Sequence, residues 1–310
     1  MASTSTATER PSSSPPATSQ PPQPTTTSFD LQPHVTKILE SNGTSSLQET
    51  ITNFISSKKP SFITIFKSLA HHYPNEFAFK LAELLNLHPD FLIRTETVSI
   101  LLNIFKESDK LNSTTMLISL KEPLLNSLMI ESNKSILRPL CEIIGLVAAR
   151  LYQFSLGGWL ELRQYVCDCF SGSTKLNHMK ALIMLAKLPE EVVEDREFWL
   201  GYGYYDVLFK NLLNFVNSLD QELRELTFNA SLVVIKMSRG LERTDVCDSL
   251  LRKLRELTFN ASLIDLQYGG EDDLLDVDLL HMVKCLGDLV RLHIEETFNG
   301  KEGDVFWCML

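Results

Sequence analysis

The cysteine and histidine side chains are the residues most able to carry chemistry, and their spacing is unlike that of a reactive site. Cys167 and Cys169 are one residue apart, whereas redox and zinc pairs commonly leave two residues between the thiols. On a helix, positions i and i+2 point to different sides. His71 and His72 close an apolar helical stretch. The chain has no GxSxG, P-loop, GxGxxG or HExxH motif. We therefore expect no enzyme activity, with no catalytic residue, metal or cofactor.

Acidic and aromatic segments are the remaining candidates for a binding role. Acidic clusters at 190–197 and 271–278 would attract basic peptides through complementary charge. The alternative is that they are solvated loops. Segment 201–205 is rich in tyrosine, which is favoured at interfaces. A bend in the packing of two helices is the other interpretation. The candidate partner-binding residues from these segments are Glu190, Glu191, Glu194, Asp195, Tyr204 and Tyr205.

Charge and composition narrow the classes of partner. The formal net charge of −10 over 310 residues argues against nucleic acid, whose phosphates select a basic face. The six cysteines are scattered and form no disulfide framework, so we expect a reduced protein of the cytoplasm, the nucleus or both. No apolar run reaches the roughly 18 residues that span a bilayer. We expect protein partners, with no nucleic acid and no membrane.

The N-terminal segment 1–28 consists mostly of Ser, Thr and Pro. Such a composition buries too little apolar surface to offset the entropy of ordering, so we expect a disordered tail. A chloroplast transit peptide is the alternative, because those peptides are rich in serine and poor in acids. Against it, Arg10 is the only basic residue of the segment, and Glu9 is its neighbour.

From Phe29 onward, apolar residues recur at helical spacing and rarely alternate as they do in strands. One such stripe is Phe62, Ile65, Phe66 and Leu69. The pattern predicts an all-α fold of six helix pairs. The expected pairs are 30–41 with 46–57, 61–87 (broken at Pro74) with 91–106, 111–130 with 134–153, 158–171 with 174–188, 196–218 with 220–238, and 244–258 with 274–297. The expected N-caps are Ser46, in a capping box with Glu49, and then Ser61, Asp90, Ser135 and Asp220.

The second helices of these pairs are alike, which indicates a repeat. A cationic residue or histidine occupies the same position in four of them, at intervals of 44, 40 and 46 residues (138 − 94, 178 − 138 and 224 − 178). These residues are Arg94, Arg138, His178 and Arg224. A period of about 40–47 residues is typical of HEAT and armadillo repeats, which stack into a continuous core. We expect these residues to join repeats. The predicted organisation is a tail over 1–28, a helical repeat domain over 29–300, and a C-terminal tail or cap over 301–310.

One segment breaks the period. Residues 223–232 recur unchanged as residues 254–263, a step of only 31 residues (254 − 223). The identity indicates a recent local duplication or a gene-model error, and the sequence leaves both interpretations open.

Two stretches carry a resemblance to known proteins. One is Gly-Trp-Leu-Glu-Leu-Arg-Gln-Tyr-Val at 158–166 with the helix that follows at 175–182, and the other is Leu-Arg-Glu-Leu at 223–226. Over 29–300 the chain resembles plant HEAT/ARM-fold proteins related to the importin-β (karyopherin) superfamily, and in particular a plant family of ARM-type-fold proteins. The resemblance implies a right-handed α-α superhelix. It also implies an acidic concave face for basic cargo, and partners such as a Ran-type GTPase.

The function we expect is a HEAT/ARM-type scaffold or adaptor that binds protein partners, including basic peptides, through the concave face of the superhelix. A truncated importin-β-like transport receptor is one alternative. A non-functional, decayed paralogue is another, because the duplicated segment disturbs the repeat.

Overall fold

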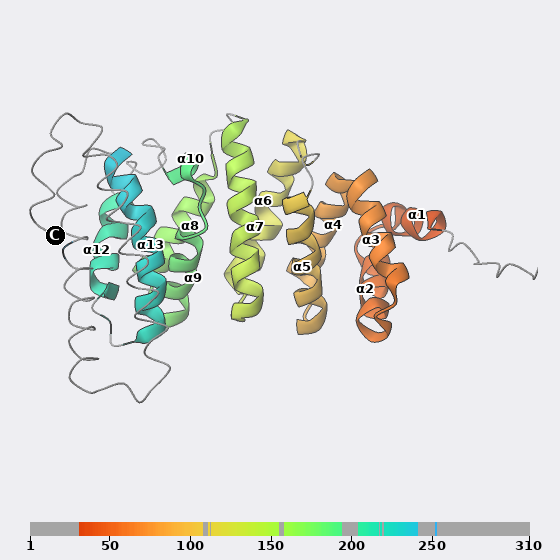
Figure 1. Ribbon diagram of the computed structural model, residues 1–310, viewed down its shortest axis with the longest axis horizontal. Helices are drawn as coiled ribbons and strands as arrows, with labels where there is room; N and C mark the ends of the chain where they lie inside the picture. Colours follow the sequence, from red (N-terminus) through yellow and green to blue (C-terminus); the bar gives the residue numbers. More distant parts are fainter. Residues whose placement is uncertain are drawn as a thin grey trace, which may run out of the picture. The chain divides into compact units, whose positions relative to one another are not determined.

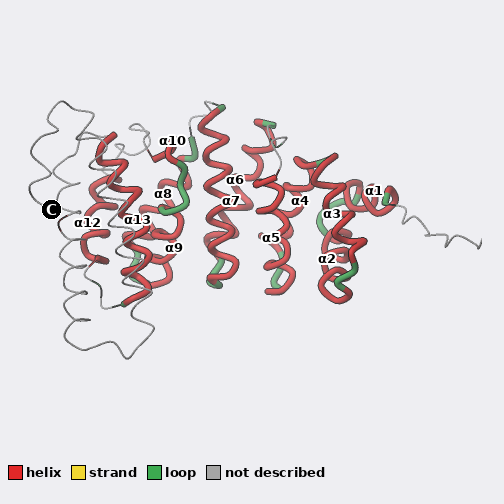
Figure 2. The backbone as a smooth tube through the Cα atoms, in the orientation of Figure 1, coloured by secondary structure: helices red, strands yellow, loops and turns green. Residues whose placement is uncertain are grey.

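The computed structural model is helical throughout its described part. The described residues are 31–107, 111, 113–154, 158–193, 204–216, 218, 220–240 and 252. The chain divides into two units, Met1–Asp30 and Leu31–Leu310, and every described residue belongs to the second. Figure 2 shows helices joined by short loops in that part. The all-α prediction is confirmed. The predicted tail, the sixth pair (apart from Arg252), the 254–263 copy and residues 301–310 lie outside the described residues.

The first five helices follow the predicted pattern, including the break at Pro74. Proline favours the first helical turn, where its missing N–H needs no partner, and both α3 and α4 begin on a proline. Lys58, with φ of 51°, turns the chain between α2 and α3. These helices are α1 (Gln32–Glu40), α2 (Ser45–Ser57), α3 (Pro60–His72), α4 (Pro74–Leu87) and α5 (Phe91–Glu107).

The later helices also form pairs at the predicted places. They are α6 (Thr114–Ile130), α7 (Lys134–Gln153), α8 (Leu160–Ser171), α9 (Lys175–Leu185), α10 (Glu190–Val193), α12 (Tyr204–Val216) and α13 (Gln221–Gly240).

Among the described helices, none combines the length and the apolar character that crossing a bilayer requires.

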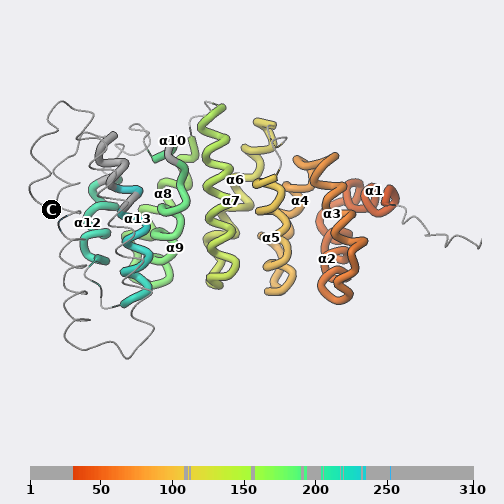
Figure 3. Tube along the Cα trace, viewed as in Figure 1, coloured from red at the N-terminus to blue at the C-terminus, as the bar shows by residue number. Residues whose placement is uncertain are grey.

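The pairs stack side by side as a solenoid (Figure 1). Within the pairs, α4 packs on α5, α6 on α7, α8 on α9 and α12 on α13. Between pairs, each second helix contacts the next, from α2 to α5, α7, α9 and finally α13. We call α5, α7, α9 and α13 the second-helix row, and Figure 3 follows the chain through it. The predicted architecture of stacked helix pairs is confirmed.

One apolar core runs along the stack. Its largest fully buried side chains include Phe77 on α4, Trp159 just before α8, and Phe170 at the end of α8. Because each pair buries apolar faces against both of its neighbours, the core continues from α1 to α13. The stripe predicted around Ile65 and Leu69 is part of it.

The helix starts agree with the sequence at two of the five predicted caps. Asp90 accepts from the Ile93 N–H at 3.0 Å, and Asp220 accepts from the Leu223 N–H at 3.1 Å. The other three predictions are wrong. Helix α2 already begins at Ser45, so Ser46 lies inside it. Helix α3 begins at Pro60, so its N-cap position is occupied by Lys59 and not by the predicted Ser61. Asn133, and not Ser135, caps α7, and it accepts from the Ser135 N–H at 3.0 Å.

Candidate binding surface

At the recurrent position of the second helices, three of the four side chains bind to residues in loops. Arg94 on α5 forms an ion pair with Glu131, in the turn between α6 and α7. His178 Nε2 lies 2.6 Å from the Gly172 carbonyl oxygen, and Arg224 donates to the Ser218 carbonyl at 3.2 Å. Arg138, on α7, is exposed instead. Three of the four positions therefore join segments of the solenoid, and the fourth projects to solvent.

The Glu131 carboxylate is buried and fully engaged. Its side chain is 2% exposed, and that of Arg94 is 14% exposed. One carboxylate oxygen meets Arg94, and the other accepts from the backbone N–H groups of Ser132 and Asn133 at 2.8 and 2.7 Å. A buried charge is tolerated when it is paired and hydrogen-bonded. This cluster fixes the α4–α5 pair to the α6–α7 pair.

Side chains of one pair also cap backbone carbonyls of the preceding pair. Lys80 donates to the Ser41 carbonyl at 2.8 Å, Arg150 to the Phe105 carbonyl at 3.0 Å, and Lys180 to the Met129 carbonyl at 2.7 Å. The last carbonyls of a helix have no partner within it, so such donors satisfy them. Lys180 is only 3% exposed, and burial lowers the pKa of its ammonium group. These contacts hold neighbouring pairs in fixed register.

Ion pairs connect the helices of the second-helix row at the surface. Lys106 on α5 and Lys187 after α9 both contact Glu142 on α7, at 2.6 and 3.5 Å. Lys106 also lowers the pKa of the Glu142 carboxyl, chiefly through their hydrogen bond. Near the start of α13, Glu222 pairs with Lys134 and with Lys175. The described ion pairs of the row thus combine lysine and glutamate side chains from neighbouring second helices.

The predicted partner-binding residues fall at the far end of the described chain. Glu190 and Glu191 belong to α10, which contacts α7 and α13, but their side chains lie outside the described residues. Glu194, Asp195 and the side chain of Tyr205 lie outside them as well. The structure brings none of these residues together in a describable site. Their role in binding stays a prediction.

Tyr204 is the one predicted partner-binding residue whose side chain can be described. It is half-buried at the start of α12. The Arg163 guanidinium lies 4.5 Å from the centre of its ring, and its hydroxyl donates to the Gln164 side-chain oxygen. Both contacts join α12 to α8. Tyr204 thus takes part in packing between neighbouring pairs, and its role in partner binding stays a prediction.

The described thiols are buried in the core. Cys141 and Cys169 lie in the core with Cys167, and all three are free cysteines. Burial raises the pKa of each thiol, to about 12 for Cys167. A thiol needs its thiolate form to act as a nucleophile or a metal ligand. Within the described ranges, His, Cys, Asp and Glu residues form no group suited to a metal ion.

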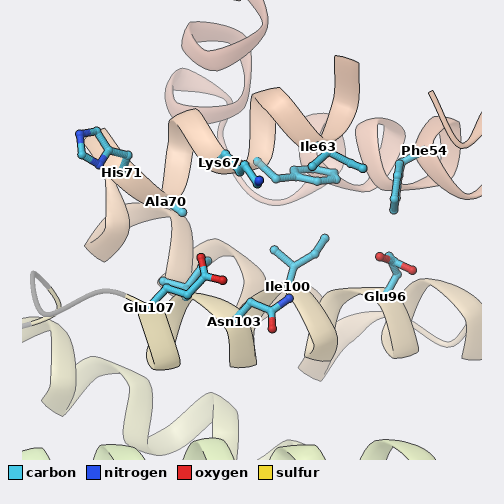
Figure 4. A pocket seen from close by; sticks show the side chains of 11 residues that line it. Phe54, Ile63, Lys67, Ala70, His71, Glu96, Ile100, Asn103 and Glu107 are labelled. Carbon is cyan, nitrogen blue, oxygen red and sulfur yellow. The ribbon is translucent and has the colours of Figure 1, made fainter. Parts of the chain in front are cut away.

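A groove opens between α3 and α5, at the first helix of the second-helix row. Its volume is about 790 Å³, within the roughly 300–1,000 Å³ that is usual for ligand pockets. Side chains from α3 and α5 face one another across it (Figure 4). The lining residues are Phe54 of α2; Ile63, Phe66, Lys67, Ala70 and His71 of α3; and Glu96, Ile100, Asn103, Ile104 and Glu107 of α5.

Sequence reasoning missed this groove. The stripe of Phe62, Ile65, Phe66 and Leu69 was assigned to the core, and Ile65, Phe66 and Leu69 are buried there. Ile63 was given no role, although it is 43% exposed at the groove. The only signal was that Glu96, Ile100, Asn103 and Glu107 share one helical face. That face could not be assigned to a groove without knowing where α3 lies.

Comparison with known proteins gives similarity of fold only. No family model matches the chain, and no curated protein matches it. Among solved structures, an engineered protein has 17% sequence identity and a TM-score of 0.46, covering 83% of this chain and 98% of that one. A designed armadillo repeat protein, solved in complex with a (KR)4 peptide, has 12% identity and a TM-score of 0.39, covering 78% of this chain and 100% of that one. With TM-scores this low, the assignment of a solenoid rests on the helix packing described above.

Proposed function

We propose that this protein is a protein-binding scaffold that holds its partner across the second-helix row. The observation that carries the proposal is that successive second helices contact one another directly and that Glu142 of α7 pairs with Lys106 of α5 and with Lys187 after α9. Arg94 and Lys180 add contacts from α5 and α9 to Glu131 and Met129 of the third pair. The outward side chains of the second helices therefore belong to one pre-organised surface. Pre-organisation lowers the conformational cost of binding a partner.

The outward side chains of this surface suit polar recognition. Ser99 and Asn103 on α5 and Arg138 on α7 are exposed. Hydroxyl, amide and guanidinium groups supply both donors and acceptors for a partner's backbone and side chains. We expect this side of the row to be the concave side of the superhelix, as the sequence predicted.

Site-specific crosslinking of the full chain tests the proposal. A photoreactive amino acid is placed at Ser99 or Arg138 on the row, and in matched controls at Ser119 of α6 or Asp168 of α8, which are exposed on first helices. In cell extract we expect one discrete product from positions 99 and 138 that excess unmodified chain competes away, and none from 119 and 168. Equal products from both sides, or no competed product, would overturn the proposal.

The same experiment separates the scaffold from the transport-receptor alternative. A GTP-loaded Ran-type GTPase is added to the extract before irradiation. A scaffold of the kind proposed keeps its product unchanged. If the GTPase itself becomes crosslinked, or abolishes the product, the chain behaves as a transport receptor and the proposed function is replaced.

A further inference from the structure

The groove between α3 and α5 carries charged side chains that form no ion pair with the described residues of the solenoid. Glu96 and Glu107 stand at the two ends of its α5 wall, and Lys67 projects from its α3 wall (Figure 4). Within the described part of the chain, none of these three residues forms an ion pair. On the second-helix row, by contrast, Glu142 and Glu222 each meet two lysines. The groove charges are therefore available to a partner.

Apolar surface lies between these charges. Ile63 of α3 is 43% exposed, and Ile100 of α5 points toward it across the gap (Figure 4). Phe54 and Phe66 also line the groove and pack edge to face, with ring centres 5.6 Å apart. We call the apolar lining formed by these two rings with Ile63 and Ile100 the floor of the groove. Burial of exposed apolar surface drives association, and the polar groups around it set the orientation. The groove thus has an apolar floor with acidic groups at either end.

We infer that this groove binds an amphipathic helix of a protein partner, with apolar residues along one face and basic residues at both ends of that face. This inference rests on the proposed scaffold function and names the kind of partner. Glu96 and Glu107 are eleven residues apart, about 16 Å along α5 at 1.5 Å per residue. A helix lying along α5 meets both carboxylates when its basic residues are also eleven positions apart.

A helical partner fits the walls better than an extended one. Both walls are helices, whose backbone N–H and C=O groups already bond within the helix. An extended segment would bring its own backbone groups against apolar side chains with few partners, which is costly. A helix satisfies its backbone internally and can pack its ridges between those of α3 and α5, as helices in grooves commonly do.

Binding of a helical peptide library to the full chain tests the inference. The library consists of 18-residue peptides whose positions 4, 8, 11, 12 and 15 vary among Arg, Glu, Leu and Ala, matching the spacing of the groove-lining residues of α5. We expect the tightest members to carry Arg at 4 and 15 and Leu between them. A preference for Glu at 4 and 15, or binding that survives a proline at position 9, would overturn the inference. So would a library without binders.

Variants of the chain locate the binding site. For the best peptide, Glu96→Gln with Glu107→Gln should weaken binding roughly threefold to thirtyfold, the effect of losing two exposed ion pairs. The matched double variant, Glu83→Gln with Glu122→Gln, removes the same charge from α4 and α6 and should leave binding unchanged. Ile63→Asp should weaken binding at least tenfold, because it places a charge on the apolar floor. Equal effects of the two double variants would contradict the inference.

Two further measurements distinguish other outcomes. If light scattering shows a dimer that Ile63→Asp converts to a monomer, a second copy of the chain covers the groove and the inference is wrong. If no peptide binds but the crosslinked product from Arg138 persists, the groove assignment fails while the scaffold function stands. If the chain with an unmodified groove gives no competed product from position 138, the scaffold function itself is wrong.

Discussion

The ion pair between Arg94 and Glu131 provides the sharpest test of how the solenoid is held together. Replacing Arg94 by Met leaves the Glu131 carboxylate, 2% exposed, without its counter-charge. Breaking a buried pair from one side costs about 3–5 kcal/mol. Because Arg94 is 14% exposed and water reaches part of it, we expect about 3 kcal/mol of lost stability.

Replacing Glu131 by Gln should cost less. The amide oxygen can still accept from Ser132 and Asn133, which donate at 2.8 and 2.7 Å. What disappears is the charge facing Arg94. Hydrogen bonds to charged groups contribute about 1.5–3 kcal/mol and neutral ones about 0.5–1.5 kcal/mol, so the difference is about 1.5 kcal/mol. The double variant Arg94→Met with Glu131→Gln should lose about 2 kcal/mol, because neither side then leaves a buried charge unpaired.

These values predict a coupling energy of about 2.5 kcal/mol in a double-mutant cycle. Urea unfolding followed by circular dichroism measures the three variants. Hydrogen exchange then shows whether the loss is concentrated at the junction of α5 and α7, because repeat arrays need not unfold as one unit. The same cycle at the exposed pair Lys37–Glu49 should show no measurable coupling. A coupling below about 0.5 kcal/mol at Arg94–Glu131 would refute the view that this pair fastens adjacent repeats.

Three further predictions concern the core. A methyl group at Gly145 of α7 would press on the Lys187 backbone, 3.2 Å from its carbonyl carbon and nearer still to its carbonyl oxygen. Gly145→Ala should therefore lower the free energy of unfolding by about 1 kcal/mol, as measured with urea, although alanine favours helices. A gain in stability would show that α7 and Lys187 are not in close contact. Because burial raises the thiol pKa of Cys167 from 9.0 to about 12, the contribution of this thiol to folding stability should be constant below pH 9 and should fall as pH rises from about 9 to 12. Urea unfolding of the chain and of Cys167→Ser across this pH range measures that contribution. Iodoacetamide at pH 8 should likewise spare Cys141, Cys167 and Cys169 until the chain unfolds, as peptide mass spectrometry would show; rapid labelling of the folded chain would contradict the burial that raises their pKa.

Much of the fold follows from the sequence because its signals are local. A helical stripe such as Ile65, Phe66 and Leu69 needs only the period of the helix to be recognised. Asp90 and Asp220 cap their helices as predicted because each is the last residue before the helix begins. Ser61 and Ser135 were wrong because Pro60 and Asn133 start those helices earlier.

The binding surface depends on contacts between residues far apart in the sequence, and so it was not predicted. The groove exists because α3 and α5 lie apart over Phe54 of α2, an offset that no local pattern encodes. Lys180 and Arg163 illustrate the same limit, since both are charged residues that the structure buries. Their sites depend on the Met129 carbonyl and on the Tyr204 ring, each about forty or more residues away along the chain.

The contact between Lys134 and Glu222 has a consequence for elasticity. It joins α7 to α13 and so passes over α9, the helix between them in the row. Bending that increases the separation of α7 and α13 must stretch this pair, whereas bending in the opposite sense does not. Both side chains reach solvent, so dissolved salt screens their attraction. The solenoid should therefore resist bending that moves α7 and α13 apart more than bending that brings them together. That difference should decrease as ionic strength rises.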